Sequence, residues 1–310
     1  MILVTGATGF VGGHLCRILR ERQMDFRAAS RRSAPGCITT GPLSAGTDWG
    51  PALAGVDTVI HLAGRAHVLR ETAADAEAAF RAVNVEGTLA LAHQAAHAGI
   101  RRFVFLSSIK VNGEHTEPGR PFTPTDPPAP QDAYGRSKAD AEAALVALAA
   151  QSGMELTVVR PPLVYGAGVG ANFSLLMRWA GSGLPCPFGA LDNRRSLVYV
   201  ETLCDLLVRA AGHPAAAGEI LMVSDDEDVS TRELFARLAT LQGRRALALP
   251  VPVSLLRTIA TLAGKRSMSD RLLSSLQVDI GQTKARLDWL PPYSLATGLQ
   301  RTVTHARTPR

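Results

Sequence analysis

The sequence predicts an α/β fold, a doubly wound parallel sheet followed by a smaller α/β domain. Short apolar runs alternate with amphipathic stretches of helical period over the first half of the chain, as expected for a parallel sheet buried on both faces. The first run, residues 2–4, leads into a glycine loop and then a helix through about residue 23. A chain of 310 residues can hold one large α/β domain or two unequal ones.

The composition is ordinary for a globular protein, with 46% apolar and 19% charged residues. The net charge of +6 is spread along the chain, and no basic run is interleaved with aromatic residues, so nucleic-acid binding is not expected. The cysteines lie far apart without a CxxC pair, which favours free thiols in a cytoplasmic protein. We expect no membrane insertion, because there is no signal peptide and the most apolar later stretch, 246–264, is broken by two prolines.

The loop after the first strand reads TGATGFVG at residues 5–12. Its glycines let backbone N–H groups approach a phosphate, and the following helix adds the positive end of its dipole. This strand, loop and helix context favours a dinucleotide site. The expected contacts are Gly6, Thr8, Gly9, Phe10, Val11 and Gly12.

The second strand, about residues 26–30, lacks the carboxylate that would bind the adenosine ribose of NAD at its end. Arg31 and Arg32 follow it instead. Two guanidinium groups suit a 2′-phosphate through charge-assisted hydrogen bonds. We therefore favour NADP(H) as cofactor, with NAD(H) as the alternative.

The next apolar strand, 57–64, ends in Leu62, Ala63 and Gly64. The small side chains at its end would let a cofactor lie against the backbone there. His61 within this run is better explained as a core histidine than as a catalyst. A helix is expected over 73–98; His93 and His97 share a face on it, but no third ligand accompanies them, so we expect no metal site.

The strand 102–106 ends at Ser107 and Ser108. Ligands bind at the carboxyl ends of parallel strands, so these hydroxyls should face the ligand. Further on, Tyr134 and Lys138 share one helix face because they are four residues apart. A cation one turn away should lower the pKa of the phenol and suit it to proton transfer with a sugar or alcohol hydroxyl.

After another buried strand, 156–160, the strict alternation of strands and helices loosens. We place a soft boundary near Gly166, which gives a Rossmann domain over 1–166 and a second domain over 167–310. Residues 197–200 and 220–223 look like strands, so part of about 193–225 is expected to return to the first domain.

Together these motifs resemble the extended short-chain dehydrogenase/reductases, the NAD(P)-dependent epimerase/dehydratase family. The matching pieces are TGATGFVG at 5–12, HLAG at 61–64, NVEGT at 84–88, LSS at 106–108, YGRSK at 134–138 and RPPLVYG at 160–166. The resemblance covers essentially the whole chain and implies a cytoplasmic enzyme with a nucleotide-sugar domain after the Rossmann domain. It also implies a homodimer formed through a four-helix bundle that includes the helices over 73–98 and at Tyr134.

Carried over by position, Tyr134 is implied as the catalytic acid or base and Ser108 as the clamp on the reacting oxygen. Lys138 would hold the nicotinamide ribose and act on the Tyr134 pKa. The resemblance adds Asn84, Ser107, Pro161 and Leu163 to the cofactor contacts. For the substrate, it implies Ser108, Lys110, Asn172, Arg195 and Arg271, with Arg195 on the diphosphate.

Sugar 4,6-dehydratases of this family carry an Asp-Glu pair after the catalytic hydroxyl, and this chain has Ile109 and Lys110 there. Dehydration is therefore not expected. The segments 107–114, 170–173 and 193–200 look most like a bacterial subgroup that acts on UDP-N-acetylhexosamines in surface polysaccharide, including lipopolysaccharide, biosynthesis.

Three functions remain open from the sequence. The first is reduction of a UDP-4-keto-6-deoxy-N-acetylhexosamine, a UDP-N-acetylquinovosamine-type 4-ketoreductase, which the arginines after the second strand favour. The second is a 4-epimerase of UDP-glucose or UDP-GlcNAc that keeps a tightly bound NAD. The third is a non-catalytic nucleotide sensor, and the intact Ser108, Tyr134 and Lys138 argue against it.

Overall fold

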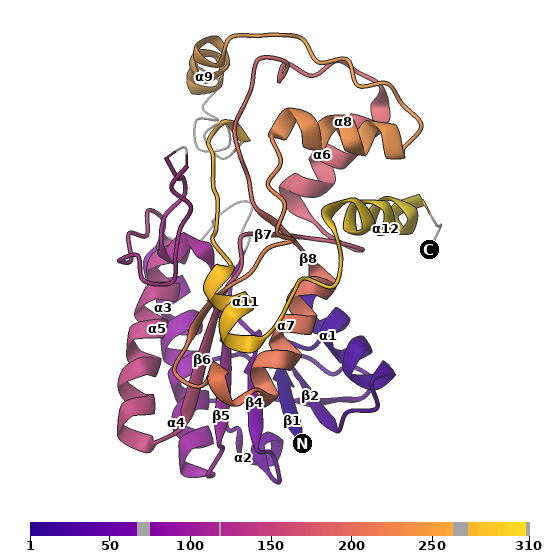
Figure 1. The fold of residues 1–310 in the computed structure, drawn as a ribbon. Coiled ribbons are helices and arrows are strands. Elements are labelled where there is room, and N and C mark those ends of the chain that lie inside the picture. Colours follow the sequence, from indigo (N-terminus) through magenta and orange to yellow (C-terminus); the bar gives the residue numbers. More distant parts are fainter. Residues whose placement is uncertain (67–74, 118, 263–271, 308–310) are drawn as a thin grey trace.

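The computed structural model describes residues 1–66, 75–117, 119–262 and 272–307 (Figure 1). Its main sheet has seven strands in the order β3-β2-β1-β4-β5-β6-β9, and every pairing in it is parallel. The strands are β1 (Ile2–Thr5), β2 (Phe26–Ser30), β3 (Cys37–Thr39), β4 (Thr58–His61), β5 (Arg102–Leu106), β6 (Glu155–Arg160) and β9 (Ile220–Met222). The chain reverses its direction of travel across the sheet between β1 and β4, the place where this class of sheet binds its ligand.

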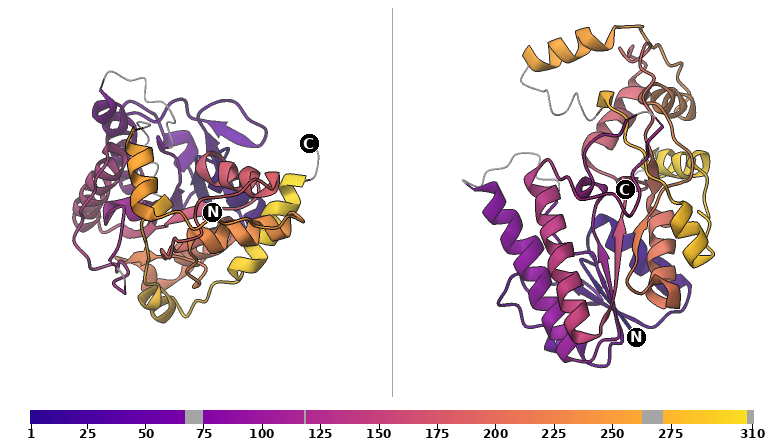
Figure 2. Two further views of the ribbon diagram at one scale, coloured as in Figure 1. Left: turned by 90° about the horizontal axis from the view of Figure 1, so that it is seen from above. Right: turned by 60° about the vertical axis from the view of Figure 1, so that its left-hand side comes forward.

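Helices cover both faces of this sheet (Figures 1 and 2). Val4, Ile60 and Val104 belong to a core shared with α1 (Phe10–Glu21) and α7 (Val200–Gly212). Their neighbours Leu3, Val59, Phe103 and Phe105 pack in a second core. Its helices are α2 (Gly50–Leu53), α4 (Thr88–His97) and α5 (Ala133–Ser152), with α3 (Ala76–Arg81) beside α5. Successive strand residues thus feed opposite cores.

A smaller part of the molecule stands beyond the carboxyl end of the sheet (Figure 1). It contains a parallel two-stranded sheet of β7 (Leu163–Tyr165) and β8 (Leu197–Tyr199). Besides α7, the helices that follow β6 in the described residues are α6 (Ala171–Ser182), α8 (Thr231–Leu241), α9 (Val253–Leu262), α11 (Gly281–Leu287) and α12 (Leu295–Arg307). Short 3₁₀ turns complete the description at Ile109–Val111 (η2) and Pro214–Ala216 (η3).

The structure confirms the predicted α/β class and refines two elements. The helix expected over 73–98 is divided, because a π-helical turn, η1 (Ala82–Gly87), separates α3 from α4, and residues 73–74 lie outside the described residues. The strand expected over 197–200 ends one residue earlier, because Val200 begins α7. Glu201 lies in the first turn of that helix, where a carboxylate is favourable.

A buried carboxylate ties the small sheet to its surroundings. Asp225 accepts a hydrogen bond from the Tyr165 hydroxyl at 2.7 Å and another from the backbone N–H of Tyr199 at 2.8 Å. α12 approaches Tyr165 so closely that a Cβ on Gly298 would overlap the Tyr165 hydroxyl. Burial raises the pKa of Asp225 to about 6.

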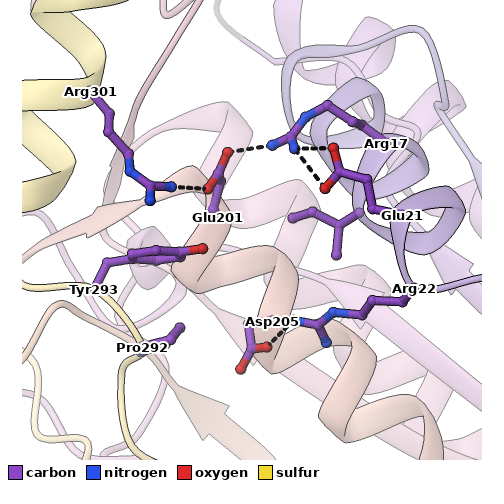
Figure 3. A pocket seen from close by; sticks show the side chains of 9 residues that line it. Arg17, Glu21, Arg22, Glu201, Asp205, Pro292, Tyr293 and Arg301 are labelled. Atoms are coloured by element: carbon purple, nitrogen blue, oxygen red, sulfur yellow. Dashed lines mark hydrogen bonds and ion pairs between the residues drawn. The ribbon is translucent and has the colours of Figure 1, made fainter.

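Ion pairs bridge α1, α7 and the C-terminal segment around a surface hollow (Figure 3). Glu201 of α7 lies between Arg17 of α1 and Arg301 of α12. Arg22, just after α1, pairs with Asp205 one helical turn further along α7. None of the residues that the sequence predicts for the active site lines this hollow, and its charges pair with one another, so it belongs to the packing of the fold.

In the described part of the chain, no helix is both long and apolar enough to cross a membrane. Within the same residues, no group of three or more His, Cys, Asp or Glu side chains is placed to hold a metal ion.

Asp225→Asn tests the buried carboxylate. The amide keeps the shape and can hydrogen-bond both tyrosines, but it cannot ionise. Because burial raises the pKa of Asp225 from 3.8 to about 6, its ionisation disfavours the folded state, and the stability present below pH 4 is lost as the pH rises through 6. We therefore expect the melting temperature of the wild type to fall relative to Asp225→Asn between pH 4 and pH 7.

Asp226→Asn provides the control, because Asp226 is exposed and pairs with Lys284 at 2.8 Å. Its pH dependence should follow the wild type. Parallel melting curves for the wild type and Asp225→Asn across this pH range would contradict the assignment.

Candidate active site

The glycine loop brings β1, β4 and α1 into close contact. Gly6 has a φ of +66°, and a Cβ on it would lie 2.8 Å from the backbone nitrogen of Ala63. A Cβ on Gly12 would overlap the carbonyl oxygen of Gly6. Gly9 precedes α1 without a side-chain cap, and the first turn of α1 carries no acidic residue. The first N–H groups of α1 are thus suited to a pyrophosphate, and the loop fits the dinucleotide expected there.

Arg31 and Arg32 follow β2 and are both exposed. The Ser30 hydroxyl donates to the Arg32 carbonyl at 2.7 Å, which shapes the turn after the strand. Neither guanidinium forms an ion pair with another described residue. Both remain available to an anionic ligand beside the adenosine end of a dinucleotide.

The end of β4 is fixed by two hydroxyl groups. Thr5 accepts from the backbone N–H groups of Leu62 and Ala63 at 3.2 and 3.3 Å and contacts His61 Nδ1 at 2.7 Å. The other ring nitrogen of His61 lies 3.0 Å from the Thr88 hydroxyl. Burial lowers the pKa of His61 to about 3. The structure confirms that His61 is a neutral core histidine.

Asn84 projects from the π-helical turn and is buried. Its side chain accepts from Arg65 N–H at 2.7 Å and donates to the Arg65 carbonyl at 3.0 Å and to the Ser137 hydroxyl at 2.9 Å. A Cβ on Gly64 would lie 3.1 Å from Asn84 Oδ1 and 3.6 Å from Lys138 Nζ. Asn84 therefore fastens the segment after β4 to α5, and Gly64 leaves room beside the lysine.

Ser108, Tyr134 and Lys138 come together where β5 meets α5. Burial raises the pKa of Tyr134 to about 12, and a hydrogen bond between Ser108 and Tyr134 opposes this effect. The sequence-based expectation of a lowered phenol pKa is therefore wrong for the chain without a bound cofactor. The reason is that burial dominates, while the Lys138 ammonium donates to the Leu106 carbonyl at 2.8 Å and lies 4.4 Å from the centre of the Phe105 ring.

Burial also lowers the pKa of Lys138 to about 8, and the Glu142 carboxylate opposes that effect. The lysine is thus held in a place where its charge is sensitive to its neighbours. A phenol whose pKa lies near 12 is protonated at neutral pH, so the site as it stands is arranged to donate a proton from Tyr134.

Lys110, expected on the substrate, is already engaged by protein groups. Its ammonium pairs with Glu114 at 2.7 Å and with Asp132. Asp132 caps α5 by accepting from Gly135 N–H at 2.7 Å. The lysine therefore anchors the start of the helix that carries Tyr134. Asp132 could have been found in the sequence, because an Asp just before a helix is a common N-cap.

Sequence reasoning also missed Glu142 and Arg160. Both are buried and form an ion pair with each other, and the Ser107 hydroxyl donates a hydrogen bond to Glu142. Two signals were available: Glu142 lies one helical turn after Lys138, and Arg160 is a charged residue at the end of an apolar strand. Neither signal reveals that the two residues meet.

The remaining predicted residues lie around this centre or beyond it. Pro161 accepts from Ile109 N–H at 3.0 Å and leads into β7, whose first residue, Leu163, is partly exposed. Ser107 is buried, whereas Asn172 is half-buried near the start of α6. Arg271 lies outside the described residues.

Arg195 precedes β8 and is half-buried. Its guanidinium donates to the Ser274 carbonyl at 2.8 Å, and burial lowers its pKa to about 10. No described carboxylate forms an ion pair with it. A partly buried cation without an anionic partner is a candidate for binding an anionic ligand.

Comparison with known proteins places these features in context. The NAD dependent epimerase/dehydratase family matches residues 2–224. The UDP-glucose 4-epimerase of Vibrio cholerae is 44% identical over 307 residues, which cover 97% of this chain and 94% of that protein.

Two solved structures share the fold. The UDP-glucose 4-epimerase of Thermotoga maritima with UDP-glucose has a TM-score of 0.78 at 23% identity, covering 99% of this chain and 98% of that one. The UDP-glucose 4-epimerase of Thermus thermophilus in complex with NAD has a TM-score of 0.78 at 22% identity, covering 100% of this chain and 99% of that one.

Two neighbouring glycines of α1 give a matched test of the glycine loop. We expect Gly12→Ala to raise the Kd for NAD by at least about tenfold, or ~1.4 kcal/mol, because its methyl group would push α1 away from the Gly6 carbonyl. In Gly13→Ala the new Cβ would lie 4.0 Å from the Ala7 oxygen, an ordinary contact, so NAD affinity should stay unchanged. Isothermal titration calorimetry of both variants measures this, and equal affinities would contradict the close packing.

Proposed function

The chain belongs to the NAD dependent epimerase/dehydratase family, and on that premise we propose that it catalyses redox chemistry at C4 of a UDP-activated sugar, with 4-epimerisation as its main reaction. The meeting of Ser108, Tyr134 and Lys138 beside Gly64 carries this proposal. The identity of 44% with a UDP-glucose 4-epimerase along nearly the whole chain supports the epimerase reading.

The proposed chemistry assigns one task to each side chain. NAD held at the glycine loop would supply the hydride acceptor and donor for C4, and inversion requires that the keto-sugar turn its opposite face to the cofactor before the hydride returns. In the oxidation step Tyr134 would take the proton of the C4 hydroxyl as a phenolate, a form that a bound cationic nicotinamide would favour over the phenol present without cofactor. In the reduction step it would give that proton back to the C4 oxygen. Ser108 hydrogen-bonds that oxygen, and the Lys138 ammonium stabilises the phenolate form of Tyr134.

The substrate diphosphate is assigned to Arg195, with Asn172 beside it. The support for Arg195 is its half-buried guanidinium, which has no carboxylate partner among the described residues. A planar guanidinium suits two phosphate oxygens. Dehydration is not proposed, because Ile109 is buried and Lys110 is paired with Glu114 and Asp132.

A second candidate is the 4-ketoreductase of a UDP-4-keto-6-deoxy-N-acetylhexosamine with NADP(H). The exposed Arg31 and Arg32 after β2, without a carboxylate at the end of that strand, favour it. Both reactions use the same Ser108, Tyr134 and Lys138. They differ in whether reduced cofactor comes from solution or is regenerated within the site.

A homodimer is also proposed, through a bundle of α3, α4 and α5 with their symmetry mates. Within one chain, α5 packs beside α3 and α4 (Figure 2). Val146 of α5 remains 53% exposed, which leaves an apolar side chain of this helix available for a contact between subunits.

Product analysis tests the reaction. We expect the purified protein to interconvert UDP-glucose with UDP-galactose, or UDP-GlcNAc with UDP-GalNAc, without net change in cofactor absorbance. Consumption of NADPH with UDP-4-keto-6-deoxy-GlcNAc, without interconversion, would favour the reductase. Neither activity would contradict both proposals.

Tyr134→Phe should reduce turnover by about 10²–10⁴-fold with little change in the Kd for NAD, because it removes the hydroxyl that transfers the proton and keeps the ring. Tyr293→Phe is the control, since Tyr293 lines the hollow beside α12. Turnover of Tyr134→Phe close to that of the control would show that another group transfers the proton.

Arg195→Ala should weaken UDP binding by roughly 1.5–3 kcal/mol, the usual contribution of a hydrogen bond to a charged group. Its neighbour Arg194 is exposed, so Arg194→Ala is a matched control that should bind UDP normally. Calorimetric titration with UDP compares the two variants. Equal affinities would place the diphosphate elsewhere.

A further inference from the structure

We propose that the buried Glu142–Arg160 pair is a positioning unit of the active site, with the Glu142 carboxylate keeping Lys138 charged and Arg160 holding that carboxylate in place. The inference rests on the proposed function, in which Lys138 acts as a cation beside Tyr134. Neither Glu142 nor Arg160 is assigned any contact with substrate or cofactor.

The geometry joins four elements. Arg160, at the end of β6, donates from Nε to Glu142 of α5 at 3.0 Å, and its Nη2 pairs with the other carboxylate oxygen. Its Nη1 donates to the Asn112 side chain at 3.0 Å, just after η2. The Ser107 hydroxyl donates to Glu142 from the end of β5. The carboxylate therefore links the residue before Ser108 to the helix of Tyr134 and Lys138.

The pair is almost completely enclosed, with Glu142 5% and Arg160 2% exposed. Removing both charges from water is expensive, and an apolar pair of similar volume is often no less stable. A buried ion pair is therefore weak support for a purely stabilising role. Its place one helical turn from Lys138 suggests what it does instead.

The surroundings of Lys138 make it dependent on this carboxylate. Burial lowers the pKa of the lysine, and the Glu142 charge raises it again. The other groups around the ammonium are the Leu106 carbonyl, the Phe105 ring, the Asn84 side chain near Gly64, and His61, and Tyr134 lies one helical turn away on α5. His61 is neutral above about pH 3 and Tyr134 is protonated up to about pH 12. Glu142 is thus the anion that acts on this lysine in the described structure.

Titration of Lys138 in the protein without added substrate or cofactor tests the proposal directly. The sequence contains four lysines, at positions 110, 138, 265 and 284, so selective ¹³C labelling of lysine gives a spectrum in which each can be assigned. We expect the Lys138 midpoint to move to lower pH in Glu142→Gln, because the amide oxygen can still accept from the Ser107 hydroxyl and from Arg160 Nε, whereas the charge is lost.

Asp140→Asn is the matched control. Asp140 is on the same helix and two residues from Lys138, but its side chain is 57% exposed, so water screens it. Its removal should leave the Lys138 midpoint unchanged. An unchanged midpoint in Glu142→Gln, or an equal shift in Asp140→Asn, would overturn the proposal.

Glu142→Gln leaves the Arg160 charge without an anionic partner. If this prevents the variant from folding, a second variant replaces it. Glu142→Gln with Arg160→Met removes both charges and keeps similar volumes. The Lys138 midpoint should again lie below the wild-type value, and a wild-type midpoint in this variant would overturn the proposal.

The pH dependence of turnover gives an independent test of the role of Glu142. If Lys138 must be charged, the alkaline limb of kcat should move to lower pH in Glu142→Gln, with the KM for the UDP-sugar little changed. A loss of kcat that is equal at every pH would indicate a merely structural role. If no sugar is turned over by the wild type, the proposed function fails, but the lysine titration still decides the role of Glu142.

Discussion

A single buried ammonium is the constraint on which the catalytic part of this structure depends. The Lys138 side chain is 6% exposed, and a charge removed from water is unfavourable unless other groups compensate it. Its compensation comes from a carbonyl at the end of β5, an aromatic face on the same strand and a carboxylate one turn along α5. The contacts of this ammonium hold α5 in a fixed position against β5. That position brings Ser108, just after β5, close to Tyr134.

The path of the chain and a second buried charge, Asp225, explain how the two parts of the molecule stay together. After β6 the chain leaves the main sheet, builds β7, α6 and β8, packs α7 back onto the sheet and returns as β9. The seventh strand therefore follows β7, α6 and β8 along the chain. Asp225 follows β9 and bonds to β7 and β8, so this carboxylate connects the main sheet with the small sheet, whose strand β8 begins just after Arg195.

Local patterns in the sequence were sufficient where the structural reason is local. Gly6 and Gly12 were identifiable because a loop between a strand and a helix needs both a left-handed conformation and close packing. Tyr134 and Lys138 followed from helical spacing. The direction of the Tyr134 pKa did not follow, because spacing says nothing of burial. The ion pair of Glu142 with Arg160 joins residues 18 apart on a helix and a strand, and each looks like an isolated charge until the sheet is assembled.

The π-helical turn at Ala82–Gly87 has a consequence for how this fold can vary. A π turn spends one more residue per hydrogen-bonded loop than an α turn, so it holds a surplus residue between α3 and α4, which both pack against α5. Deleting one residue there would restore a regular helix and turn Asn84 out of its contacts with Arg65 and Ser137, while α3 and α4 could keep their own neighbours. A single-residue deletion would thus separate the segment after β4 from α5 without rebuilding the fold.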